Sequence, residues 1–277
     1  MKKISRRSFM AAAAVSVAAL ALTACGGSAS SAASSVASSA ASSEVASSAA
    51  AELTTVEAGK LTMATNATFP PYEMTTDSGE IEGIDVDTAK AIAEKLGLEL
   101  QIDDMEFDAA LLSVQQGKAD IVMAGVTVTD ERKAVMDFSD SYATGIQSII
   151  VPNDSDIASP DDLACKKIGT QRGTTGYIYC SDDFGEDSVV AYDSGLTAVQ
   201  ALNNGQVDAV VIDNAPATEY VAANPGLKVL DTSYAEEDYA IGMAKGSALE
   251  DAVNKALEEL KADGTLQAIV DKYINAN

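Results

Sequence analysis

The chain has 277 residues and is strongly acidic, with 18 lysine and arginine residues against 42 aspartate and glutamate residues. It contains no histidine and no tryptophan. This charge argues against nucleic acid and anionic lipid as partners, and the lack of histidine excludes Ser-His-Asp and Cys-His catalysis and the usual zinc ligand sets. We therefore expect neither a metal site nor a cofactor.

The first 24 residues have the pattern of an export signal. Lysines at positions 2 and 3 and arginines at positions 6 and 7 precede an apolar run, residues 10–22, that is too short to span a bilayer comfortably. The run ends in Leu22-Thr-Ala-Cys25, which resembles a bacterial lipobox. We expect residues 1–24 to be a lipoprotein signal peptide and Cys25 to carry the lipid. The arginine pair also resembles a twin-arginine motif, so the export route stays open.

A serine- and alanine-rich segment follows. Between Ser28 and Ala50 the chain holds only serine, alanine, two valines and one glutamate, a composition that cannot bury a core. We expect residues 25–57 to be a linker, and a flexible chain of about 30 residues reaches roughly 30 Å on average.

The globular part opens with strands alternating with helices. The patterns predict strands over residues 60–65, 98–102 and 119–124, with helices from about residue 84 to Leu96 and over residues 107–116. This alternation predicts a parallel sheet with right-handed crossovers, and ligands bind beyond the carboxyl ends of such strands. Because Asn66, Phe107 and residues 125–132 each follow a strand end, we expect them to converge on one crevice.

Residues 119–132 predict a buried strand, a tight turn and a helix start. Thr129 is suited to cap the helix, and the acidic residues Asp130 and Glu131 suit its first turn. Arg132 meets the wrong end of the helix dipole there, so it needs a compensating partner. Its own acidic neighbours or a bound anion could serve, and an arginine fork matches a carboxylate well.

A second series of strands and helices follows a long extended segment, residues 138–152. Strands are expected over residues 166–171, 188–192, 207–212 and 227–230, with helices over 175–182, 195–204 and from residue 214. Residues 238–245 are expected to return as a second extended crossover, before helices over 249–262 and 266–274. The fold class is thus α/β, with two Rossmann-like lobes, residues 58–147 plus 240–277 and residues 148–239, around a hinge-bending cleft.

The second lobe offers two polar features at strand ends. Gly173-Thr-Thr-Gly176 presents backbone N–H groups and hydroxyls at a helix start, but it lacks the Lys-Ser/Thr of a phosphate loop and so does not predict nucleotide binding. Asp213 ends an apolar run. It either caps the next helix or faces the cleft as a carboxylate for an ammonium.

Six segments, in order, resemble the type 3 extracellular solute-binding proteins, which serve polar amino-acid ABC importers. They are residues 64–73, Gly83-Ile-Asp-Val-Asp87, residues 125–132, Phe138-Ser-Asp-Ser-Tyr142, Gly173-Thr-Thr175 and residues 208–213. Thr88 departs from the pattern, since an apolar residue is usual there. The resemblance implies a Venus-flytrap fold of the type II periplasmic-binding class, closest to the glutamine-binding branch.

The resemblance also implies ligand roles. Arg132 would bind the ligand α-carboxylate, helped by Gly125 and by hydroxyls or amides of three threonines, and Asp213 would bind the α-ammonium, with the Gly125 carbonyl. Phe69 and Phe107 would sandwich the ligand side chain; for Phe107 an ordinary core position is the alternative. The full expected set is Asn66, Phe69, Phe107, Ala124, Gly125, Thr127, Arg132, Gln171, Thr174, Thr175 and Asp213.

Asn66 bears on the ligand class. Relatives that bind lysine, arginine, histidine or glutamine usually carry an acid at this position, whereas Asn66 and Gln171 are neutral. We therefore predict a polar ligand with a neutral side chain. Two aromatic faces also accept a guanidinium, so arginine stays open.

Two cysteines remain after Cys25. In an exported chain an even pair suggests a disulfide, and a strand followed by a returning helix brings Cys165 and Cys180 toward one edge. We expect them to be bridged.

The sequence thus predicts a monomeric amino-acid-binding lipoprotein, anchored on the extracellular face of the bacterial cytoplasmic membrane, that delivers a free amino acid to an ABC permease. It is not expected to be an enzyme. The alternatives are a dehydratase-like enzyme on the same scaffold, for which Glu73 and Asp213 are the only candidate acids or bases, and an amino-acid-sensing or adhesive surface lipoprotein.

Overall fold

A computed structural model describes residues 53–274 of the chain. The predicted signal peptide, residues 1–24, the predicted lipidation site Cys25 and most of the linker lie outside the described residues. Within the described part, no helix combines the length and the apolar character needed to cross a membrane.

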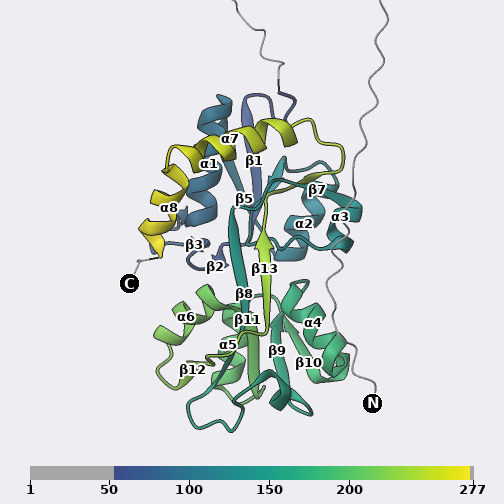
Figure 1. Cartoon of the computed structure of the whole chain (residues 1–277), viewed down its shortest axis with the longest axis vertical. Coiled ribbons are helices and arrows are strands. Elements are labelled where there is room, and N and C mark those ends of the chain that lie inside the picture. Colours follow the sequence, from purple (N-terminus) through teal and green to yellow (C-terminus); the bar gives the residue numbers. More distant parts are fainter. Residues whose placement is uncertain (1–52, 275–277) are drawn as a thin grey trace, which may run out of the picture. The chain divides into compact units, whose positions relative to one another are not determined.

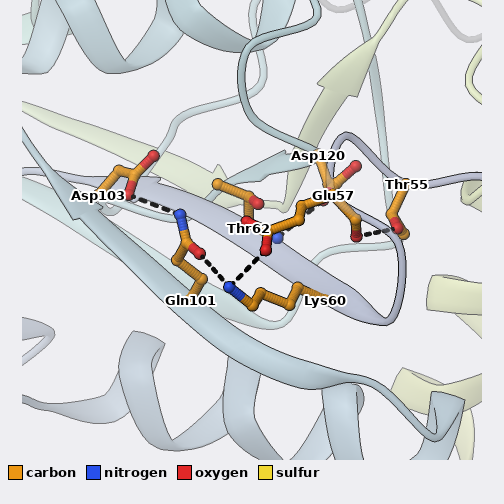
Figure 2. Close-up of polar contacts among 7 residues, drawn as sticks. All are labelled: Thr55, Glu57, Lys60, Thr62, Gln101, Asp103 and Asp120. Atoms are coloured by element: carbon orange, nitrogen blue, oxygen red, sulfur yellow. Dashed lines mark hydrogen bonds and ion pairs between the residues drawn. The ribbon is translucent and has the colours of Figure 1, made fainter.

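The described chain begins with a short segment that hydrogen bonds and an ion pair hold beside the first strand (Figure 2). The carboxylate of Asp120 accepts hydrogen bonds from the backbone N–H groups of Val56 at 2.7 Å and Thr62 at 2.8 Å. Lys60 pairs with Glu57 at 2.6 Å, and Leu53 packs against the core. Residues 53–57, assigned to the linker from composition, therefore belong to the fold.

The first sheet has the strand order β5-β1-β6-β14-β7, and its strands β5, β1 and β7 are labelled in Figure 1. Strands β1, β5 and β6 run parallel, as expected, whereas β14 pairs antiparallel with both β6 and β7. The sheet is therefore mixed, because the chain returns to it from the second sheet. Its strands are β1 (Lys60–Thr65), β5 (Glu99–Asp104), β6 (Ile121–Val122), β7 (Met136–Phe138) and β14 (Gly242–Ala244).

Five helices follow or flank these strands: α1 (Ile84–Leu96), α2 (Phe107–Gln115), α3 (Asp130–Val135), α7 (Glu250–Ala262) and α8 (Thr265–Tyr273). Helix α1 buries one apolar face that includes Ala89, Ile92 and Ala93, and it ends at Gly97, whose left-handed φ of 71° suits glycine. Helices α1, α7 and α8 pack on one another.

The second sheet has the order β10-β9-β11-β8-β12, with β13 also paired to β8. All five residues of β11 are buried, as expected for a central strand covered on both faces. The strands are β8 (Ala143–Pro152), β9 (Ile168–Gln171), β10 (Val189–Tyr192), β11 (Ala209–Asp213), β12 (Leu227–Val229) and β13 (Ala235–Tyr239). The helices are α4 (Thr175–Phe184), α5 (Gly195–Asn203) and α6 (Asn214–Ala222), with short 3-10 turns at Pro160–Leu163 and Glu186–Ser188.

Two paired strands connect the sheets. β8 and β13 lie side by side and antiparallel, with Ala143 opposite Tyr239 and Gln147 opposite Ala235 (Figure 1). Gly145 of β8 leaves room for the ring of Tyr239, because a Cβ atom there would lie 2.5 Å from that ring. The lobe boundary expected between residues 147 and 148 cuts through β8.

Three expectations about elements need correction. The loop expected after residue 65 forms a small antiparallel sheet of β2 (Thr68–Phe69), β3 (Glu73–Thr75) and β4 (Ile81–Glu82). The extended segment expected over residues 138–152 is interrupted, because β7 and β8 belong to different sheets, and the strand expected over 119–124 shortens to β6.

The predicted disulfide is wrong. Both Cys165 and Cys180 are free thiols, the first exposed and the second buried. Cys180 points from α4 into an apolar cluster with Ile149, Val151 and Leu163, whereas Cys165 lies in a turn with a φ of 64°. The two thiols thus lie in different environments, one in the packed interior and one at the surface.

Candidate ligand-binding site

A cavity lies where loops of the first sheet meet loops of the second. The structure brings all eleven expected residues together around it and adds one further residue, Glu73. The lining residues are Asn66, Phe69, Glu73, Phe107, Ala124, Gly125, Thr127, Arg132, Gln171, Thr174, Thr175 and Asp213.

Arg132 places a buried cation at the cavity. Thr129 caps α3 by accepting the backbone N–H of Arg132, as expected from the sequence, and Arg132 is only 8% exposed. Its Nη1 donates to the Thr127 carbonyl at 2.7 Å and its Nη2 to the Gly173 carbonyl at 3.1 Å. The ring of Phe107 lies 5.4 Å from the guanidinium carbon.

No carboxylate of the described residues forms an ion pair with Arg132, and its neighbours Asp130 and Glu131 are exposed. Burial lowers the pKa of the guanidinium, and nearby acids oppose that shift. A guanidinium has five N–H donors in a fork that matches an anion, and two of them donate to these backbone carbonyls. The interpretation in which its own neighbours neutralise Arg132 is therefore wrong.

Asp213 places a buried carboxylate at the same cavity. It precedes α6, yet its side chain makes no capping hydrogen bond, so the helix-cap interpretation is wrong. Its Oδ2 accepts a hydrogen bond from Gln147 Nε2 at 2.8 Å, and its Oδ1 accepts one from the Tyr239 hydroxyl. Burial, reinforced by the nearby charge of Glu237, raises its pKa to about 7.

Several backbone and hydroxyl groups near the cavity already have hydrogen-bond partners within the protein. Gly125, with a φ of 55°, donates its N–H to Asp85 at 3.0 Å, so its carbonyl, not its amide, is left for a ligand. The Thr174 hydroxyl donates to the Gln171 carbonyl and caps α4 at Tyr177. Thr174 thus shapes the helix start, whereas Thr127 and Thr175 line the cavity and their hydroxyls donate to Glu237.

Two side-chain amides that line the cavity, those of Asn66 and Gln171, form a hydrogen bond with each other. The Asn66 Oδ1 atom accepts hydrogen bonds from Gln171 Nε2 and Thr68 Oγ1, both at 2.9 Å, and Asn66 Nδ2 donates to the Met105 carbonyl at 2.8 Å. Gln171 Nε2 also donates to the Asp193 carbonyl at 3.4 Å, which leaves Gln171 Oε1 as an acceptor. Buried Phe69 and Phe107 line the space beside these amides.

Two buried acids at the site were not among the ligand contacts expected from the sequence, although Glu73 was a candidate in the enzyme alternative. Glu73 is fully buried, and neither of its carboxylate oxygens has a hydrogen-bond partner among the described residues. Burial raises its pKa well above the usual range, and the charge of Asp85 adds to this. Glu237 lies in the run Glu236-Glu237-Asp238, which nothing local distinguishes from an exposed acidic surface.

Two α/β sheets joined by paired crossover strands, with a buried cation and a buried anion at a cavity between them, define a solute-binding protein. This chain belongs to the bacterial extracellular solute-binding proteins, family 3, whose model matches residues 61–276.

Three known proteins show the extent of the similarity. The probable histidine-binding protein of Neisseria gonorrhoeae is 34% identical over 271 residues, which cover 95% of this chain and 94% of that protein. The L-cystine-binding protein TcyJ of Escherichia coli is 33% identical over 223 residues, 79% of this chain and 84% of that protein. The solved structure of the arginine-, lysine-, histidine-binding protein ArtJ from Geobacillus stearothermophilus is 34% identical, covers 79% of this chain and 96% of that chain, and superposes with a TM-score of 0.76.

Proposed function

We propose that this protein captures a free amino acid in the cavity and delivers it to an ABC importer in the bacterial cytoplasmic membrane. The observation that supports this proposal is one cavity with a buried guanidinium and a buried carboxylate, neither of which forms an ion pair with another described residue. Leaving either charge buried and unpaired is costly. A zwitterion meets both, with its α-carboxylate on Arg132 and its α-ammonium on Asp213.

The eleven expected residues are the proposed ligand contacts, with the exception that Thr174 acts through the helix start and Gly125 through its carbonyl. The names of the three relatives support an amino acid as ligand. We further propose that Cys25 carries a lipid anchor, that the protein acts as a monomer on the outer face of the membrane, and that it catalyses no reaction.

The first candidate class of ligand is an amino acid with a polar, neutral side chain. Asn66 and Gln171 are uncharged, and their amides form a hydrogen bond with each other at the cavity. A cationic side chain is the second class, and one observation favours it. Glu73 lines the same cavity, is fully buried, and has two carboxylate oxygens without partners among the described residues. A guanidinium or ammonium on the ligand would supply the missing donors.

The test is a thermal-shift panel of the standard amino acids, cystine and ornithine, followed by calorimetric titration of those that stabilise the protein. We expect one or two amino acids to raise the melting temperature. Arg132→Ala should weaken their binding by about two orders of magnitude, because it removes one partner of a buried charge pair. Arg172→Ala, which removes an exposed arginine from a neighbouring loop, is the matched control and should bind normally.

Glu73→Gln separates the two ligand classes. If the preferred ligand is neutral, the variant should bind it as the wild type does; if it is arginine, lysine or ornithine, binding should weaken by about tenfold or more. A protein that is stabilised by no amino acid, and from which none can be extracted, would contradict the proposed function.

A further inference from the structure

Glu237 is a buried carboxylate that joins both sides of the cavity without lining it. It lies in the crossover strand β13 and is 6% exposed. Its Oε2 atom accepts three hydrogen bonds: from the Thr175 hydroxyl at 2.9 Å, from Gln147 Nε2 at 3.0 Å and from the Thr127 hydroxyl at 3.2 Å. Its Oε1 atom has no partner among the described residues.

These contacts determine where the hydroxyl protons lie. A threonine hydroxyl has one proton and two lone pairs, and an ionised carboxylate can only accept. Thr127 and Thr175 therefore donate their protons to Glu237 and retain only lone pairs. Since both side chains line the cavity, they present acceptors to a ligand, although from the sequence they were expected to help bind its carboxylate.

Gln147 extends the same arrangement to Asp213. Its Nε2 group has two protons, and it donates at 2.8 Å to Asp213 Oδ2 and at 3.0 Å to Glu237 Oε2. One amide nitrogen thus holds two buried carboxylates around it. The space for the Gln147 amide exists because residue 176 is glycine, where a Cβ atom would lie 2.9 Å from Gln147 Oε1.

The result is a cluster of acceptors at one end of the cavity: the carboxylate of Asp213 and the hydroxyl oxygens of Thr127 and Thr175. A primary ammonium has three N–H donors and no acceptor, so it matches three converging acceptors. A carboxylate placed against the same atoms would find no donor, and it is left to Arg132.

We propose that Glu237 is a positioning residue for the ligand ammonium: by taking the hydroxyl protons of Thr127 and Thr175, it turns both oxygens into acceptors beside Asp213. This inference rests on the proposed function, because it names the group of the amino acid that the hydroxyls recognise. Glu237 itself acts through the two threonines and through Gln147.

The experiment compares an amino acid with the same molecule lacking its α-amine. The probes are L-glutamine with glutaramic acid, and L-arginine with 5-guanidinopentanoic acid, measured by calorimetric titration or by displacement where binding is weak. In Glu237→Gln the new amide N–H donates to one of the two threonine hydroxyls. That hydroxyl can no longer donate to residue 237, so its proton turns away and competes with the ligand ammonium. We expect amino-acid binding to weaken by about tenfold, while the analogue without the amine binds as it does to the wild type.

Glu236→Gln is the matched control, because it removes the same charge from the adjacent, exposed position of β13 and should leave both affinities unchanged. Equal weakening of the amino acid and its analogue in Glu237→Gln would show a merely structural role and overturn the proposal, as would tighter amino-acid binding. If that variant does not fold, the isosteric Thr175→Val removes one acceptor and should give the same selective loss. Failure of the wild type to bind any amino acid would count against the proposed function itself.

Discussion

Burial of Asp213 links the stability of the empty protein to pH. Its pKa in the folded chain is raised to about 7, chiefly by burial, whereas in the unfolded chain it returns to the ordinary value near 3.8. The folded state therefore binds this proton more tightly, so the free energy of unfolding falls as the pH rises between these two values and levels off above the folded pKa.

We predict that Asp213→Asn removes this pH-dependent contribution to the free energy of unfolding. Between about pH 5 and pH 7, the free energy of unfolding of the wild type should fall by about 2 kcal/mol more than that of the variant. Urea unfolding across this range measures the difference, and Asp231→Asn, at an exposed position, is the control. The variant should also lose amino-acid binding, so a residue that costs stability in the empty protein is retained for the ligand. Identical pH profiles for wild type and variant would refute this.

The paired crossover strands hold the ammonium end of the site in place. Gly145 of β8 faces Tyr239 of β13, and the hydroxyl of Tyr239 donates to Asp213. We predict that Gly145→Ala lowers the free energy of unfolding by about 1–3 kcal/mol, because the new methyl group overlaps the buried ring. It should also weaken amino-acid binding, since the displaced ring moves the hydroxyl that orients Asp213.

Unfolding curves and calorimetric titration measure both effects. Gly226→Ala is the matched control, because a Cβ atom there meets nothing within 4 Å. If Gly145→Ala binds amino acids with unchanged affinity, the crossover pair does not orient the site.

Long periodic elements could be predicted from the sequence, and short ones could not. Helix α1 carries a repeating apolar face and a terminal glycine, so local residues define both its length and its end. The two- and three-residue strands β2, β3 and β4 contain too few residues to show a period. They exist because they pair with one another, which no local pattern reveals.

The same division holds within the site. Residues in the segments that follow strand ends, such as Asn66 after β1 and Arg132 in the segment after β6, could be placed together because the parallel topology fixes which strand ends meet. Glu73 follows a proline-rich loop and Glu237 lies in an acidic run, so their burial depends on partners distant in the sequence. Cys180 was misassigned for a related reason: spacing brings segments together, but packing decides where a side chain points.

At the scale of the whole molecule, contacts between the two sheets' elements surround the cavity. Gln171 donates to Asn66 at 2.9 Å, and Arg132 donates to the Gly173 carbonyl at 3.1 Å. Outside the cavity lining, the Tyr220 hydroxyl of α6 donates to the Thr68 carbonyl of β2. Contacts of this kind exist only while the two sides are together, so they favour the state that encloses a ligand.

We predict that Tyr220→Phe weakens amino-acid binding without touching the ligand. Loss of one hydrogen bond that is present only in the enclosed state lowers the population of that state, and the apparent affinity should fall by about two- to tenfold. Stopped-flow measurements should place the change in a faster dissociation rate, because the opened protein releases its ligand. Tyr192→Phe is the control, since within the described residues that hydroxyl makes no hydrogen bond. An unchanged dissociation rate in a folded Tyr220→Phe protein would mean that this contact does not hold the two sides together.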